Sequence, residues 1–574
     1  MILSKPSLTF LFVFVTYLAS SQVPVGFTIM DENTTEKIKY CLVKSNISGE
    51  SYLSNANGWV HIHTPIEKDT LTFEYPGYQP TRKPILEIKD SSVIYINSDD
   101  TIAQNIYSNL SQSSLHEYII KGSQQLFKKP VIASKSYLDF YSMTDGKDTE
   151  MSRFYYNTQI QGSKILNMSF KQGRVALIPQ TNGLAGLNPS LALIKYSPVH
   201  DSRTLPKNPL QQDLAERMGD LWDFTVLPAT IDDDALSISF TPKNTEDGNL
   251  FGGEILINVS TYDIKYISLH IPTAHTHPFV TVADDTIMDV SLDLKYFFTT
   301  ESNGTDQMAY AVYYYSFDYF ADKSKLYIKK RIFTEGIFHL YGDKTSFFIP
   351  KLRYAQPFDD YIKSALYPSH DDFWDENDRL MVTDQQIQKL PAFASKGVMY
   401  NYFDSNDEII IKNKIISEFS IIWNKDNFLN LRQNVISDTI VTDLSVDIFL
   451  NIDTYNGQTI FNTMTVLDYL HTNYSLEYNT QNLVYQNIYF DLCEIVRLNL
   501  NETLKGLKAA EDMNMAHEAA LKDLESVTTK YKSETNKGSD IHQLKKWNDL
   551  VLQRTGVDNF QSFKLRYKPK KRKR

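Results

Sequence analysis

The chain has 574 residues, with 58 Lys and Arg against 69 Asp and Glu and a net charge of −11. This length exceeds a single hydrophobic core, and the acidic balance argues against a nucleic-acid partner. The two cysteines, Cys41 and Cys493, exclude a disulfide-stapled fold and a cysteine-ligated zinc ribbon. We expect two buried free thiols, with a Cys41–Cys493 disulfide as the alternative. The 36 Tyr and 32 Phe favour β-strands.

The first residues predict export. A short apolar run covers residues 8–18 after Lys5, and Ala19-Ser20-Ser21 places small residues before Gln22. This order is typical of a secretory signal peptide over residues 1–21, and the run is too short to span a bilayer. A buried strand is the alternative interpretation. We expect an exported protein that stays in the periplasm, associates with the outer membrane or is secreted, with no transmembrane span after cleavage.

Residues 22–97 predict a small β-sandwich. Short apolar segments alternate with turn signals, among which Asn57-Gly58 is a strong hairpin dipeptide. Leu71, Phe73 and Tyr75 alternate with polar residues, which is the period of a half-buried strand. Strands this short at such spacing are typical of two packed sheets.

Two segments of this region resemble carboxypeptidase-regulatory-like domains. Residues 54–62 (SNANGWVHI) are similar to the turn and strand of that family, and residues 69–78 (DTLTFEYPGY) match its following motif. The departures are Ser54 for the usual Thr and Val60 for the usual Phe. The resemblance implies a prealbumin-like sandwich at the N-terminus of a Bacteroidetes-type exported protein. The helix-then-strand order after it, and residues 371–378 (DDFWDEND), resemble the uncharacterised β-rich region that follows such domains.

Residues 98–385 predict a mainly antiparallel β domain of the α+β class. A capping box at Ser114 and helical spacing from Leu115 to Leu126 indicate a helix that ends before Pro130. Strands are expected at 136–141, 236–240, 251–258, 262–267, 288–298, 310–320, 326–333 and 347–349. A curved sheet packed by one or two helices satisfies this pattern.

Residues 386–563 predict a mainly helical C-terminal region, with helices over 469–507, 509–531 and 540–554. The polybasic tail, residues 564–574, contains eight Lys and Arg residues. A solvated chain end is one interpretation of it. The other is attraction to the phosphates of an anionic membrane surface.

The sequence carries no recognisable catalytic motif, so we expect no catalytic residue and no cofactor. The zinc carboxypeptidase element H-x-x-E is absent, as are H-E-x-x-H and G-x-S-x-G. Residues 342–345 (GDKT) are similar to part of a phosphate-binding loop, but Asp343 lies between the Gly and the Lys. Its acidic side chain would repel phosphate. The catalytic half of the carboxypeptidase family is therefore not expected.

Two H-x-H pairs are the candidates for metal binding. His61 and His63 lie at strand spacing and can share one face, with exposed strand histidines as the alternative. His275 and His277 lie between two prolines, near Asp284 and Asp285. Two histidines and a carboxylate can bind Zn²⁺, and a polar loop without metal is the alternative.

The sequence predicts a multidomain, β-rich protein whose function is binding. The hypothesis is a non-enzymatic cell-envelope scaffold or binding protein that contacts a protein partner through its β-sandwich and β-rich body. The alternative is an envelope glycan- or peptide-directed hydrolase without a recognisable linear motif.

Overall fold

The computed structural model describes most of the chain. It covers residues 24–63, 65–97, 110–178, 193–194, 203–227, 235–280, 285–300, 306–321, 328–342, 345–349, 360–366, 371–402, 420–426, 428–437, 439–455, 458–468 and 471–568. The predicted signal peptide and the last six residues of the polybasic tail lie outside the described residues.

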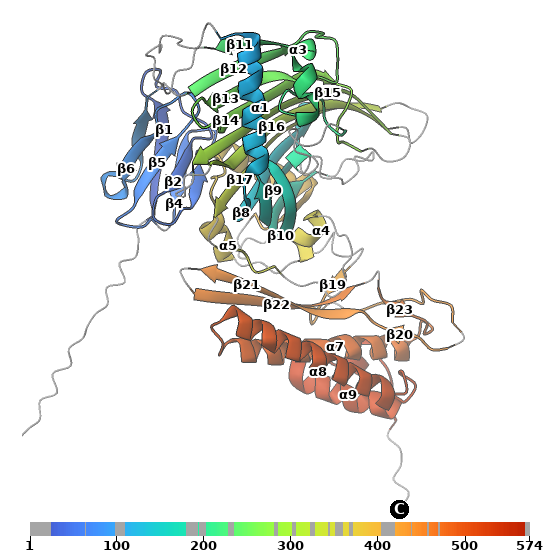
Figure 1. The fold of residues 1–574 in the computed structure, drawn as a ribbon. Coiled ribbons are helices and arrows are strands. Elements are labelled where there is room, and N and C mark those ends of the chain that lie inside the picture. The colour runs from blue at the N-terminus through green and yellow to red at the C-terminus, as the bar shows by residue number, and fades with distance from the viewer. Residues whose placement is uncertain are drawn as a thin grey trace, which may run out of the picture.

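The N-terminal module is a β-sandwich, as the sequence predicts (Figure 1). One sheet has the order β4-β1-β7 and the other β3-β2-β5-β6. Between them Phe27, Ile29 and Phe73 are fully buried. Gly58 has a φ of 69°, which the Asn-Gly turn requires. The elements are β1 (Val25–Asp31), β2 (Leu42–Ser45), β3 (Ser51–Leu53), β4 (Trp59–Ile62), β5 (Thr70–Glu74), β6 (Thr81–Pro84), η1 (Ile85–Glu87) and β7 (Ser92–Ile96).

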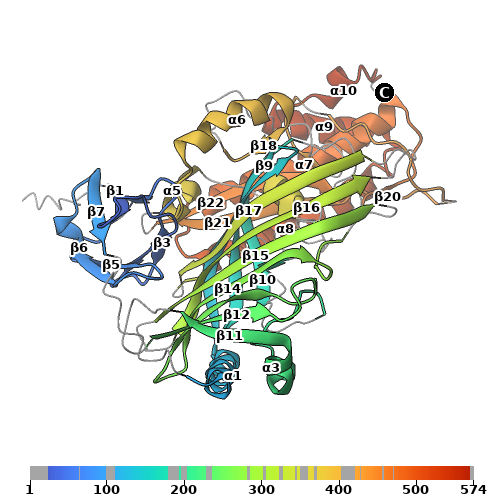
Figure 2. The same ribbon diagram turned by 90° about the horizontal axis from the view of Figure 1, so that it is seen from above.

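The central module is an eleven-stranded, antiparallel, open sheet. Its order is β11-β12-β13-β14-β15-β16-β17-β8-β9-β10-β18. The strands are β8 (Val131–Thr144), β9 (Lys147–Gln161), β10 (Lys164–Leu177), β11 (Trp222–Leu227), β12 (Ala235–Pro242), β13 (Gly252–Asn258), β14 (Ile264–Ala274), β15 (Thr286–Thr300), β16 (Asp306–Ala321), β17 (Ile328–Gly342) and β18 (Val398–Tyr400). Figure 2 shows how strongly this sheet curves.

The order of the central strands departs from the order of the chain. The meander β8-β9-β10 enters the sheet beside β17, so that residues 202 positions apart, Tyr137 and His339, lie in register. The helices of this module are α1 (Gln112–Lys128), η2 (Gln212–Arg217), α3 (Met218–Leu221), α4 (Asp360–Leu366), α5 (Asp371–Asn377) and α6 (Asp384–Lys396). Residues 347–349, expected as a strand, have no regular structure.

Helix α1 packs its predicted apolar face on β13 and β14. Leu115, Ile119 and Leu126 are buried in the main core, and a Cβ at Gly122 would meet Ile264 at 3.3 Å. The predicted cap is wrong, however. The helix begins three residues earlier, because the hydroxyl of Ser111 accepts a hydrogen bond from the Ser114 amide at 3.2 Å.

The C-terminal module combines the expected helices with strands that the sequence did not predict. Its helices are α7 (Thr480–Leu504), α8 (Ala510–Glu534), α9 (Ile541–Thr555) and α10 (Asn559–Ser562). Its strands are β19 (Ser420–Ile422), β20 (Thr442–Asp443), β21 (Val446–Tyr455), β22 (Gln458–Asp468) and β23 (Asn473–Tyr474). The first helix therefore begins at Thr480 and not at residue 469, because residues 473–474 pair with β20.

The two cysteines, Cys41 and Cys493, are buried free thiols, as the sequence predicts. Among the residues that the structure describes, no helix combines the length and apolar character needed to cross a bilayer.

A buried ion pair joins the central sheet to the C-terminal module. The Nζ of Lys171, on β10, is fully buried and lies 2.7 Å from a carboxylate oxygen of Asp453 on β21. The same ammonium donates to the side chain of Asn451 at 2.6 Å and to the carbonyls of Phe348 and Ile452, each at 2.9 Å. The pair offsets its desolvation because each proton of the ammonium has an acceptor.

We expect the substitution Lys171→Met to destabilise the protein by about 3–5 kcal/mol, because it leaves the Asp453 carboxylate buried without its counter-charge. Denaturant unfolding measures the effect. Lys389→Met is the matched control, since its pair with Asp148 is about one-third exposed on each side and should contribute less than about 1 kcal/mol. Equal effects of the two substitutions would contradict the prediction.

Candidate functional site

The β-sandwich is fixed against the central sheet by polar contacts. Glu335 on β17 forms an ion pair with Lys39 and accepts a hydrogen bond from the hydroxyl of Tyr40 at 2.8 Å. Arg379, just after α5, pairs with Glu50 at 2.7 Å, and its carbonyl accepts the Leu53 amide at 2.9 Å. The sandwich and the sheet therefore form one preformed surface.

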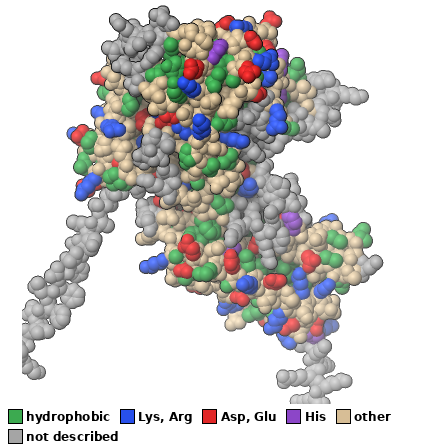
Figure 3. Space-filling view, in the orientation of Figure 1, with side chains coloured by type: hydrophobic (Ala, Val, Ile, Leu, Met, Phe, Trp, Pro, Cys, Tyr) green, Lys and Arg blue, Asp and Glu red, His purple; other side chains and the backbone are tan. Residues whose placement is uncertain are grey.

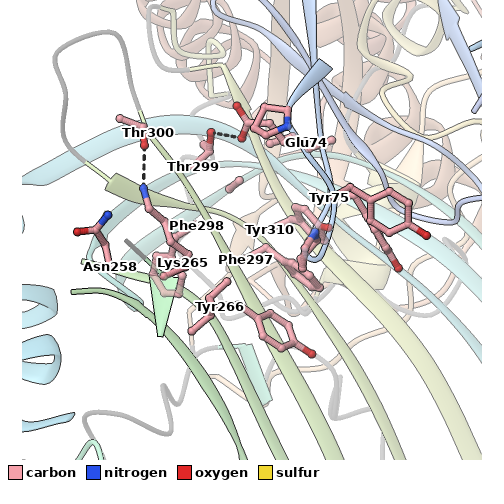
Figure 4. Close-up of a pocket in the computed structure, with 17 residues that line it drawn as sticks. Glu74, Tyr75, Asn258, Lys265, Tyr266, Phe297, Phe298, Thr299, Thr300 and Tyr310 are labelled. Carbon is pink, nitrogen blue, oxygen red and sulfur yellow. Dashed lines mark hydrogen bonds between the residues drawn. The ribbon is translucent and has the colours of Figure 1, made fainter. Parts of the chain in front are cut away.

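A cleft of about 300 Å³ lies where these two modules meet (Figure 4). The sandwich contributes the end of β5 and the turn after it, and the sheet contributes β12 to β16. The lining residues are Leu42, Glu74, Tyr75, Pro76, Tyr78, Pro80, Ala235, Leu256, Asn258, Lys265, Tyr266, Phe297, Phe298, Thr299, Thr300, Ala309 and Tyr310. Its size falls in the range of natural ligand pockets.

Aromatic rings form much of the wall. Phe297 stacks on Tyr310 with ring centroids 4.2 Å apart and planes at 14°, and Tyr266 lies 5.0 Å from Phe297. From the sandwich, Tyr75 and Tyr78 pack edge to face at 5.4 Å. Burial raises the pKa of Tyr266 to about 12, so this phenol is neutral at physiological pH. These rings carry no charge and pack against one another.

The polar side chains of the cleft are hydrogen-bonded within the protein, to one another or to neighbouring residues. Thr299 donates to Glu74 at 2.7 Å, and Lys265 donates to Thr300 at 2.9 Å, as the dashed lines in Figure 4 mark. Lys265 also pairs with Asp306 at 2.8 Å. The hydroxyl of Tyr78 donates to Asp31, and the hydroxyl of Tyr310 donates to the Tyr40 carbonyl. The side-chain oxygen of Asn258 accepts hydrogen bonds from the amides of Ser260 and Thr261. The cleft therefore offers mainly apolar and aromatic surface to a ligand.

None of these residues was predicted as a site from the sequence. Phe297 and Tyr310 fit equally well as ordinary strand aromatics, because their function depends on the neighbouring module. The motif Tyr75-Pro76-Gly77-Tyr78 was the one sequence signal for the cleft. A turn that carries two tyrosines beside a proline is unusual for a buried core.

A serine–histidine arrangement also lies between the sandwich and the sheet. The Oγ of Ser51 is 2.8 Å from Nε2 of His339, and Nδ1 of His339 is 3.2 Å from the hydroxyl of Tyr137. Burial lowers the pKa of His339 well below its usual value, so the imidazole is neutral. The adjoining cavity measures only about 30 Å³, which is room for about one water molecule. This arrangement holds β3 on β17 and leaves no space for a substrate.

The structure places the predicted histidines apart from the cleft. His275 packs against Gly248, and His277 stacks on Phe279 at 5.5 Å, so the two contact different neighbours. Asp284 lies outside the described residues, and Asp285 accepts the hydroxyl of Tyr319. Within the described ranges, no three His, Cys, Asp or Glu side chains converge in a metal-binding group. The predicted zinc pair at His275 and His277 gains no support.

Glu150 and Asp491 are among the buried carboxyl groups whose pKa values are raised. Burial raises the pKa of Glu150 to about 7. Hydrogen bonds from Tyr361 at 2.5 Å and Ser152 at 2.9 Å lower this pKa, but the effect of burial is larger. Burial likewise raises the pKa of Asp491 to about 6, although Trp423 and Asn559 donate to it. Neither group lines the cleft, and each joins one helix to its neighbours.

Comparisons with known proteins assign no family. No protein-family model matches the chain, and no curated protein matches its sequence. The solved MucA/MucB complex of Pseudomonas aeruginosa is similar at 9% identity and a TM-score of 0.14, over 39% of this chain and 93% of that chain. A DUF1329 family protein from Desulfovibrio piger is similar at 8% identity and a TM-score of 0.17, over 41% of this chain and 93% of that chain. A protein of unknown function from Bacteroides fragilis is similar at 7% identity and a TM-score of 0.11, over 56% of this chain and 97% of that chain.

These likenesses are distant, and TM-scores this low establish neither a shared fold nor a shared function. The resemblance of residues 54–62 and 69–78 to the carboxypeptidase-regulatory-like family stays a prediction, to which the observed sandwich adds the expected architecture.

We expect Glu150→Gln to stabilise the protein at pH 8 by roughly 1–3 kcal/mol. The pKa of Glu150 is higher in the folded state (about 7) than its usual value of 4.5, so folding takes up a proton between these pH values. Stability from this group therefore falls as pH rises through that window. Denaturant unfolding at pH 5 and pH 8 measures it. A variant that gains as much at pH 5 as at pH 8 would contradict this assignment.

Proposed function

We propose that the protein is a non-enzymatic binding protein of the cell envelope. It holds an apolar or proline-rich segment of a partner protein in the cleft between the β-sandwich and the central sheet. The observation that carries this proposal is the aromatic wall of Tyr75, Tyr266 and Phe297, shared by two modules that are fixed to each other. The predicted signal peptide supports the location in the envelope.

The chemistry of the wall favours a peptide. Proline-rich segments bind in aromatic-lined grooves, and they lose little conformational freedom on binding because their extended helix is preformed. A glycan needs many hydrogen-bonding partners, whereas Glu74, Lys265 and Asn258 are already bonded within the protein. An apolar cleft therefore suits a segment that contributes rings and methylene groups.

The hydrolase alternative would require a nucleophile or paired carboxylates at an open site. The Ser51–His339 pair has a nucleophile–base geometry but borders a cavity of only about 30 Å³. Glu74, a carboxylate that lines the main cleft, accepts a hydrogen bond from Thr299, and Lys265 is paired with Asp306. These features support a binding function over catalysis.

A second contact, with an anionic membrane surface, is supported by the start of the polybasic tail. Phe563, Leu565 and Tyr567 pack against the core of the C-terminal module, while Lys564, Arg566 and Lys568 are exposed. The hydroxyl of Tyr567 lies 3.1 Å from Nδ1 of His542, which fixes the strand-like alternation. Elsewhere on this module, charges of both signs are interspersed (Figure 3). The tail is therefore a local concentration of positive charge.

We expect Tyr266→Ala to weaken binding of a short synthetic proline- and leucine-rich peptide by about tenfold, because aromatic side chains dominate binding energy at such sites. Isothermal titration with the purified protein measures the dissociation constant. Tyr478→Ala is the matched control, since Tyr478 is 53% exposed and lies on the C-terminal module. Binding of peptidoglycan or chitin oligosaccharides in preference to the peptide would overturn the proposed ligand class.

For the membrane contact we expect the triple substitution Lys564→Gln, Arg566→Gln and Lys568→Gln to reduce binding to phosphatidylglycerol vesicles. Each basic residue near an anionic surface contributes on the order of 1 kcal/mol, and the contribution falls as salt rises. Vesicle sedimentation at two salt concentrations measures the effect.

A matched control removes three exposed charges from the helices, by Lys505→Gln, Lys522→Gln and Lys530→Gln. If this control loses as much vesicle binding as the tail variant, net charge explains the association and the tail has no special role.

A further inference from the structure

The histidines of the first H-x-H pair lie together at the end of β4. Nδ1 of His61 is 3.3 Å from Nε2 of His63, and the ring planes are perpendicular, with centroids 4.3 Å apart. Both side chains are only half-buried, so solvent reaches them. The alternation of a strand brings residues i and i+2 to one face, which explains the meeting.

The separation of the two nitrogens fits a shared metal ion. Imidazole nitrogens bind Zn²⁺ at about 2.0–2.1 Å, and two such ligands at tetrahedral angles lie roughly 3.3–3.4 Å apart. Imidazole ligands select transition metals over Mg²⁺ and Ca²⁺, which prefer oxygen. The observed 3.3 Å therefore matches the spacing of a zinc-binding pair.

The negative charge of two carboxylates near α5 favours a cation at this pair. The β3–β4 hairpin packs on the segment after α5, because the Leu53 amide donates to the Arg379 carbonyl at 2.9 Å. Asp375 and Asp378 both act electrostatically on His63. Asp378 is bound by Arg153 at 2.5 Å and is buried, whereas Asp375 is exposed. Figures 1 and 2 both place α5 beside this side of the sandwich.

We propose that His61 and His63 form a binding site for a divalent transition-metal ion of the Zn²⁺ class, with water completing its coordination. The pair supplies the two nitrogen ligands. This site is independent of the aromatic cleft.

Titration with ZnCl₂, and with CoCl₂ followed by visible absorption, tests the site in tag-free purified protein. We expect one ion per chain, and the double substitution His61→Ala and His63→Ala should weaken binding at least ~100-fold. The matched control is His275→Ala and His277→Ala, which has the same sequence spacing and should bind as tightly as the original protein. Single His63→Gln, checked by thermal unfolding, separates loss of a ligand from loss of fold.

Three results would overturn the proposal. One is the absence of saturable Zn²⁺ binding to the original protein, which would leave a simple imidazole–imidazole hydrogen bond. Another is unchanged binding in the His61/His63 variant, and a third is loss of binding in the His275/His277 control.

Discussion

The buried Lys171 ammonium is the interaction on which the arrangement of the modules depends. It extends from β10 of the central sheet into the C-terminal module, where Asp453 and Asn451 accept its protons. A charge at this depth is tolerated only when its protons are paired. Displacement of β10 against β21 would leave the Lys171 ammonium and the Asp453 carboxylate buried without their partners.

The sandwich is attached to the same sheet by a different chemistry. Glu335, His339 and Tyr310 on β16 and β17 bond to polar groups of β3 and of the loop before β2. These bonds surround the apolar cluster in which Leu42 and Leu53 meet the sheet aromatics. The cleft at the margin of this contact is therefore built into the resting molecule, and a ligand need not organise it.

Local patterns predicted the strands of the central sheet but not the cleft. Alternating apolar residues at 236–240 and 288–298 fall within β12 and β15, because half-buried strands carry that period in their own residues. The hairpin β21–β22 was missed, since Asn and Thr residues obscure its alternation, although Asn456-Gly457 is a hairpin signal between its strands. The cleft and the His61–His63 meeting depend on tertiary geometry. For the histidines, the i, i+2 spacing was a usable signal, whereas nothing local distinguishes Phe297 from a core residue.

The position of β8 beside β17 has a consequence for how the chain folds. The meander β8-β9-β10 leaves one edge unpaired until β17, about two hundred residues later in the chain, has been synthesised. Contacts this distant in sequence are slow to form, and an exposed strand edge in the interval invites wrong pairing. Since β16 and β17 also carry the sandwich contacts, docking of the first module must come after closure of the sheet. The β-sandwich, although it precedes the sheet in the chain, is thus among the last parts to reach its final place.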